Sequence, residues 1–157
     1  MVIVPFQPQR SLPQFSHLVA AYEVLDGDTV AVSLDLGFRT TIRTRVRLPY
    51  IDAPEMTDSR QRAAAMAVRE LAWHWLAAIP PGRLMCWTTD QPDKYGDRWS
   101  GTFYDLAKPV MEETLHEFLL RQGCAKRYRG GAKPSWTDAE LAAIIASVES
   151  LLQRKIT

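Results

Sequence analysis

The sequence predicts an α+β fold that combines a small, five-stranded Greek-key β-barrel with three α-helices. Two patterns carry this prediction. Apolar and polar residues alternate over about 17–50, as in β-strands, whereas apolar residues recur every three or four positions over about 59–78, as in an amphipathic helix. Two short strands and two helices follow. This order fits a barrel of the OB type better than a parallel sheet, in which strands and helices would alternate regularly.

The first strands are predicted because apolar side chains occupy alternate positions and therefore lie on one face. Residues 28–36 and 39–48 each place mainly apolar side chains on one face. These side chains are Val30, Val32, Leu34 and Leu36 in the first strand, and Ile42, Thr44, Val46 and Leu48 in the second. The opposite face of the second strand carries Arg43, Arg45 and Arg47, and Pro49 should end its pairing because proline lacks an N–H. Residues 83–90 and 98–106 read as the later strands, joined by a polar hairpin or loop.

The three helices are bounded by residues that favour helix ends. The helix over about 59–78 stops at a Pro-Pro-Gly sequence, and the next spans 109–122, with Pro109 suited to its first turn and Gly123 to its C-cap. A basic, glycine-rich loop at 127–136 precedes the last helix, which starts near Thr137, three positions before Glu140, as in a capping box. Residues 1–14 contain three prolines and no period, so we expect an irregular arm ahead of a domain at 15–157.

Composition restricts the classes of protein and of partner. The chain has 157 residues and a formal net charge of +1, so attraction for phosphate must come from local clusters of arginine and lysine. Cys86 and Cys124 form neither a disulfide framework nor a zinc motif, and we expect two reduced, partly buried thiols. We find no signal peptide and no membrane span. We therefore expect a protein that stays in the cytoplasm or is carried in a virus particle, without a membrane partner.

Four stretches carry polar residues that suggest chemistry: DGDTV (26–30), RLPYIDAPE (47–55), DKYGDR (93–98) and RQGCAKRY (121–128). Singly, each has a simple structural interpretation. DGDT is a common turn, with Asp26 and Gly27 expected to serve it, and Asp52 and Glu55 around a proline could start a helix as N-cap and third residue. Together, however, they supply carboxylates for a hard cation, arginines for a phosphate and a spare carboxylate to activate water.

The order and spacing of these motifs resemble the staphylococcal-nuclease (thermonuclease-like) family over about 17–155. DGDTV is similar to the first motif of that family. Arg47-x4-Asp52-x-Pro54-Glu55 is similar to the second, and DKYG followed by Arg98 to the third. The resemblance implies the five-stranded OB barrel with three helices, in agreement with the pattern of elements above.

The resemblance also implies roles at a metal and phosphate site. Asp28 and Asp52 would be carboxylate ligands of Ca²⁺, with Mg²⁺ or Mn²⁺ as alternatives, and the backbone carbonyl of Ala53 would be a third ligand. Glu55 would orient or deprotonate the attacking water. Arg47 would bind the scissile phosphate and stabilise its transition state.

A second set of residues would contact the leaving group and the nucleotide. Arg98 would be the second arginine, near the leaving oxygen, while Lys94, Tyr95 and Tyr128 would contact the terminal phosphate and base. The expected activity is hydrolysis of DNA and of RNA, preferably single-stranded, leaving 3′-phosphate ends. Two readings stand beside it: a non-catalytic OB-fold module that binds nucleic acid, and a structural component of a larger assembly such as a virus particle, with the arm as a docking strand.

The chain departs from the family pattern at two motif positions. Ala53 stands where a threonine is usual, which keeps a carbonyl ligand but loses a hydroxyl. Asp97 is inserted between Gly96 and Arg98, where arginine usually follows the glycine directly. A shift of one residue in a strand turns the side chain to the opposite face unless the turn absorbs it.

Overall fold

The computed structural model describes residues 15–92, 96–108 and 113–156. The predicted arm at 1–14 and the predicted substrate residues Lys94 and Tyr95 lie outside these ranges. Within them, both cysteines are free and buried, as expected. In the described part of the chain, no helix is long and apolar enough to cross a membrane.

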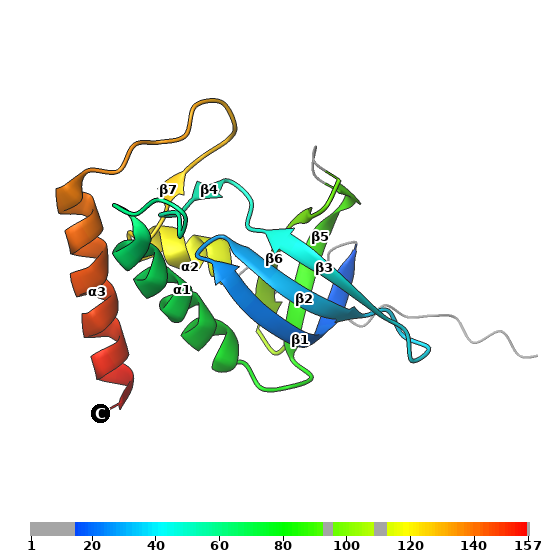
Figure 1. Ribbon diagram of the computed structural model, residues 1–157. Helices are drawn as coiled ribbons and strands as arrows, with labels where there is room; N and C mark the ends of the chain where they lie inside the picture. Colours follow the sequence, from blue (N-terminus) through cyan, green and yellow to red (C-terminus); the bar gives the residue numbers. More distant parts are fainter. Residues whose placement is uncertain (1–14, 93–95, 109–112, 157) are drawn as a thin grey trace, which may run out of the picture.

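Five strands form a closed barrel, which confirms the predicted fold class (Figure 1). In barrel order they are β1 (Ser16–Asp26), β2 (Thr29–Asp35), β3 (Thr41–Arg47), β6 (Trp99–Asp105) and β5 (Leu84–Pro92). All neighbours are antiparallel except β3 and β6, which run parallel, with Val46 opposite Trp99 and Arg47 opposite Ser100. The barrel closes through this parallel contact, which brings the start of β6 beside the end of β3.

The remaining elements cover one side of the barrel and one of its ends. The helices are α1 (Arg62–Ala77), α2 (Leu115–Arg121) and α3 (Asp138–Ile156), and two short strands, β4 (Ile51–Asp52) and β7 (Lys126–Arg127), pair antiparallel. Helix α1 packs on β1 and against α3, and the figure shows these two helices side by side (Figure 1). The core between barrel and helices contains Val30, Val32, Val46, Val68, Leu71 and Phe103.

The predicted alternation in β2 and β3 is confirmed within the barrel. Val30, Val32, Leu34 and Val46 are buried, while Arg43 and Arg45 are exposed. The prediction is wrong for Ile42, which is 44% exposed, and for Leu36, which is 43% exposed. Both lie toward the turn of the β2–β3 hairpin, which extends beyond the rest of the barrel (Figure 1). The described residues leave both side chains more than 40% exposed there.

The helix boundaries differ from prediction at two places and agree at a third. Helix α1 begins at Arg62, well after Asp52 and Glu55, so neither carboxylate lies in its first turn. Helix α2 begins at Leu115, not at 109, and Pro109 lies outside the described residues. The predicted capping box of α3 is confirmed, because the Thr137 N–H donates to Glu140 Oε2 and the Glu140 N–H donates to Thr137 Oγ1.

Gly27 is required by packing rather than by turn conformation. A Cβ atom on this glycine would lie 2.6 Å from Cγ1 of Val68 on α1 and 3.1 Å from Cβ of Ala53. The turn between β1 and β2 therefore approaches α1 and the segment after β4 closely enough to exclude a methyl group.

Gly27→Ala should lower the free energy of unfolding by about 1–3 kcal/mol, because an added methyl group overpacks this contact. Urea unfolding measures the loss. Val68→Ala provides the matched test, since it removes the atom that clashes. The double variant should be more stable than the sum of the two single losses predicts. Additive losses in the free energy of unfolding would show that contact with Val68 is not the reason that glycine is required at position 27.

Candidate functional site

Three segments meet at the end of the barrel where β3 stops. They are the β1–β2 turn with Asp28, the last residue of β3, Arg47, and β4 with the residues that follow it. The Leu48 N–H donates to the Asp28 carbonyl at 2.8 Å, and the Ala53 N–H donates to Asp28 Oδ2 at 3.2 Å. Asp28 is thus fixed by backbone groups of both neighbouring segments. The structure brings together Asp28, Arg47, Asp52 and Ala53, all of them predicted site residues.

The guanidinium of Arg47 lies between two carboxylates. Its Nη1 forms an ion pair with Asp28, and its Nη2 lies 3.9 Å from Asp52 Oδ1. Nη2 also donates to the Ile51 carbonyl at 3.2 Å. The Arg47 side chain is only 18% exposed, unlike the solvated arginines Arg43 and Arg45 on the same strand face. The Arg47 guanidinium is therefore fixed by its contacts at the edge of the hydrophobic core.

Asp52 is the most deeply buried acid of the site. The residue is 2% exposed, and its Oδ1 makes no hydrogen bond to any described residue. Burial raises the pKa of Asp52, the Lys133 charge opposes this, the Asp28 charge adds to it, and Arg47 opposes it. A buried carboxylate oxygen without a hydrogen bond is costly, so Asp52 is positioned at the expense of stability.

Glu55 and Lys133 add a second ion pair at the outer edge of the site. Lys133 Nζ contacts Glu55 Oε1 and lies 3.7 Å from Asp52 Oδ1. The Glu55 N–H donates to Gln61 Oε1 at 3.0 Å, which fixes the backbone of this residue before α1. The Lys133 and Glu55 side chains are 53% and 44% exposed, so the pair can open to solvent. Sequence reasoning missed Lys133, because nothing in its basic loop indicates a contact 78 positions away.

Asp26 closes the β1–β2 turn opposite Thr29, as predicted, and it also lies close to the acids of the site. Its pKa is raised by burial first and then by the charges of Asp28 and Glu55. Its buried Oδ1 has no hydrogen-bond partner among the described residues. A register shift between Val24 and Asp26 interrupts the β1–β2 ladder, and such bulges re-aim side chains at the ends of strands. The signal available in the sequence was the equal parity of Asp26 and Asp28.

The cluster is acidic overall. Asp26, Asp28, Asp52 and Glu55 face two cations, Arg47 and Lys133, which leaves a net charge of −2 when all six are ionised. Over 15–92, 96–108 and 113–156, no three His, Cys, Asp or Glu side chains converge as a metal-ligand group. Asp28 and Asp52, whose charges interact, could offer carboxylate oxygens to a cation, with water completing a shell of oxygen atoms. Such a shell suits Ca²⁺ or Mg²⁺.

Asp97 and Arg98 lie where β6 begins beside the end of β3. Asp97 Oδ2 lies 3.7 Å from Arg45 Nη1 at an exposed position, so its charge has a partner outside the acidic cluster. Arg98 precedes β6 and has the parity of Ser100, which is the register partner of Arg47. This parity is what a shared face with Arg47 requires. The inserted residue belongs to the connection before the strand.

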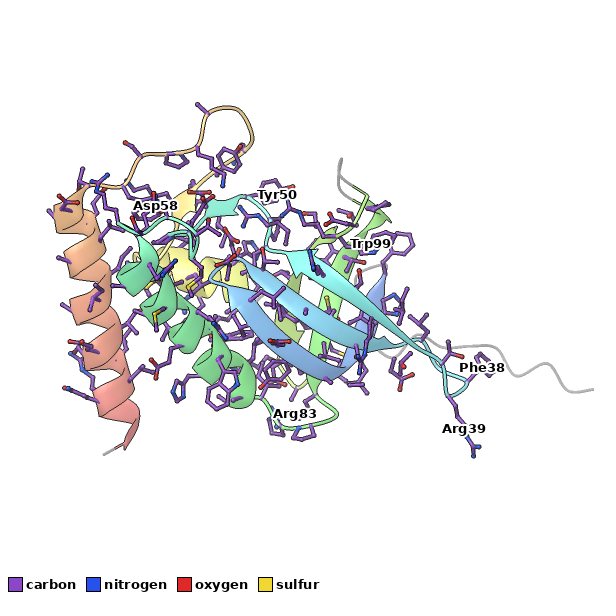
Figure 2. The ribbon with its side chains drawn as sticks, in the orientation of Figure 1. Phe38, Arg39, Tyr50, Asp58, Arg83 and Trp99 are labelled. Atoms are coloured by element: carbon purple, nitrogen blue, oxygen red, sulfur yellow. The ribbon has the colours of Figure 1, made fainter. Side chains whose placement is uncertain are left out.

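Tyr128 lies beside the β3–β4 connection. Its N–H donates to the Tyr50 carbonyl at 2.8 Å, and its hydroxyl donates to the Gly131 carbonyl at 2.9 Å. Tyr50, labelled in Figure 2, is 64% exposed and has a positive φ of 60°, so the connection turns sharply before Asp52. The Tyr128 backbone is thus joined to the connection that leads to Asp52; the sequence predicted Tyr128 as a site residue but not Tyr50.

No protein-family model matches the sequence, and no curated protein matches it.

Asp26→Asn should stabilise the metal-free protein at pH 7 by about 1 kcal/mol, the scale of one poorly satisfied buried polar group. The raised pKa of Asp26 means that its ionised form is disfavoured in the native state. The gain is therefore present above the folded pKa and disappears below the unfolded value of about 3.9, where the carboxyl group is protonated in both states.

Urea unfolding in EDTA at pH 7 and near pH 3 measures this difference in stability. Glu23→Gln, at an exposed position of β1, is the control variant. Equal stability of Asp26→Asn and the unmodified protein at pH 7 would contradict the assignment of Asp26 to the cluster.

Proposed function

We propose that this protein is a divalent-metal-dependent nuclease that hydrolyses phosphodiester bonds of DNA and RNA, preferably single-stranded. The observation that carries the proposal is the position of Arg47, whose guanidinium lies between Asp28 and Asp52 with Glu55 nearby. A bidentate phosphate binder, two buried carboxylates and a more exposed carboxylate thus occupy one end of the barrel. Phosphodiester hydrolysis needs these groups together.

Asp28, Asp52 and the Ala53 carbonyl are the residues that would hold the cation. When bound, the cation would neutralise charge on the phosphate oxygens. Arg47 would exchange the Asp28 carboxylate for the phosphate, a pairing of the same charge and fork geometry. Asp28 would then be free to serve as a ligand. The ion pair supports this proposal, because it holds the Arg47 guanidinium beside both carboxylates that would bind the cation.

Glu55 is the candidate general base. Its carboxylate would take a proton from water as the water oxygen bonds to phosphorus and the bond from phosphorus to the leaving oxygen breaks. This requires Lys133 to release Glu55, and both side chains are exposed enough to move. By resemblance to the staphylococcal-nuclease family, we expect 3′-phosphate ends and a supporting role for Arg98 near the leaving oxygen.

A second candidate function is that of a non-catalytic module that binds nucleic acid. The observation that favours it is that two acids of the cluster already pair with the protein's own cations, Asp28 with Arg47 and Glu55 with Lys133. A nuclease assay with Ca²⁺, Mg²⁺ and Mn²⁺ separates the two. A structural role in a larger assembly stays a further alternative and is compatible with either activity.

Arg47→Ala should lower kcat on denatured DNA by roughly 10²-fold or more, because the guanidinium charge acts on the transition state. Cleavage is followed at saturating Ca²⁺, and EDTA should abolish it. Arg69→Ala, at an exposed position of α1, controls for the loss of one positive charge and should leave kcat unchanged. If no metal supports cleavage while the protein still binds single strands, the nuclease proposal is wrong and the non-catalytic binding module is the better account.

Lys133→Met should tighten Ca²⁺ binding about two- to fivefold, because it removes a cation that competes for Asp52 and Glu55 in an exposed ion pair. Calorimetry without substrate measures the affinity directly. Lys108→Met is the matched control, since Lys108 pairs with Glu113 instead. Unchanged or weaker Ca²⁺ binding by Lys133→Met would show that Lys133 supports the site rather than competes for it.

A further inference from the structure

Strand β3 carries a row of arginines that leads out of the candidate site. Arg43, Arg45 and Arg47 share one face because side chains of alternate residues point the same way. That face is the outside of the barrel, since the intervening Val46 is fully buried and Arg43 and Arg45 are exposed. Neighbours in the row are about 6.6 Å apart along the strand. This spacing is similar to that of successive phosphates in an extended single strand of nucleic acid.

The surface beside this arginine row is low and slightly hollow. Opposite Arg43 and Arg45 lie Ser33 and Ala31 of β2, and opposite those lie Ala21 and Glu23 of β1. These small side chains, with Arg43 at one edge and Glu23 at the other, line a shallow hollow of about 270 Å³. The backbone of a polymer can lie close to such a surface. The arginines make the β3 side of the hollow positively charged.

The charges of the two outer arginines of the row, Arg43 and Arg45, are little used by the fold. Among the residues that the structure describes, the Arg43 side chain forms no ion pair or hydrogen bond, and the Arg45 side chain has only the exposed contact with Asp97 at 3.7 Å. Exposed pairs of that kind contribute little to stability. In a protein whose formal net charge is +1, two such arginines beside a third at the site form a local basic track.

The far end of the row is aromatic. Phe38 is fully exposed at 103%, and Figure 2 shows Phe38 and Arg39 at the tip of the β2–β3 hairpin, away from the barrel. An exposed ring beside a guanidinium is a platform on which a base can stack while its phosphate is paired.

We propose that the outer face of β3 is an extended binding track for single-stranded nucleic acid. Arg45 and Arg43 bind the phosphates that follow the scissile one, and Phe38 stacks a base at the end. With one phosphate for every two strand residues, the track from Arg47 to Phe38 spans about four or five nucleotides. This inference rests on the proposed function for the direction of the track, but its binding test does not require cleavage.

The test compares fluorescent thymidine oligonucleotides of three and twelve residues by anisotropy, in EDTA so that no cleavage occurs. The double variant Arg43→Gln/Arg45→Gln should bind the twelve-residue strand about tenfold or more weakly, with the slope of log K against log salt reduced by about 1.4. Binding of the three-residue strand in EDTA should be unchanged, and so should its cleavage in a separate assay with Ca²⁺. Arg62→Gln/Arg69→Gln on α1, which removes the same charge elsewhere, should leave long-strand binding unaffected.

Phe38→Ser should weaken binding of the long strand without changing the salt slope, since stacking releases no counterions. Unchanged long-strand affinity in the arginine variant overturns the track, even where cleavage is intact and the proposed function stands. If the unmodified protein binds the long strand more tightly than the short one but cleaves neither, the track is supported and the nuclease proposal is contradicted. Binding of anionic lipid vesicles with no binding of oligonucleotides also overturns it.

Discussion

The ion pair between Arg47 and Asp28 is the interaction on which this end of the barrel depends. It joins the β1–β2 turn to the last residue of β3, and Nη2 of the same guanidinium continues to the Ile51 carbonyl and the Asp52 carboxylate of β4. Buried carboxylates are tolerated only with compensating charge. Arg47 supplies that charge, so the close approach of three segments around Gly27 is possible without neutralising the acids.

The same end of the molecule retains features that a purely structural barrel would not need. One buried oxygen of Asp26 and one of Asp52 have no hydrogen bond among the described residues, and burial raises the pKa of both groups. Such local costs are typical of functional sites, which give up stability for preorganised charge. Lys133 offsets part of the cost from outside while leaving Glu55 able to open to solvent. Arg47 and Lys133 thus hold the carboxylates of the cluster close together.

Residue periodicity predicts much of this fold, because the buried faces of β2 and β3 follow a strict period of two. Motif spacing likewise predicts that Asp28, Arg47 and Asp52 meet. Three features could not be predicted in this way. Ile42 and Leu36 follow the period but project beyond the covering layers. Gly27 is needed for its approach to Val68, and Lys133 reaches Glu55 across 78 positions. These depend on packing between distant segments, which local pattern does not encode.

The central claim is that Arg47 and Asp28 hold each other in place of a phosphate and a cation. A crystal structure with Ca²⁺ and a thymidine dinucleotide that carries a non-hydrolysable phosphonate linkage tests it most directly. The account predicts that the Arg47 guanidinium lies on the phosphonate oxygens and that Asp28, Asp52 and the Ala53 carbonyl face the ion. An Arg47 still paired with Asp28, with the dinucleotide or the ion bound elsewhere, would contradict it.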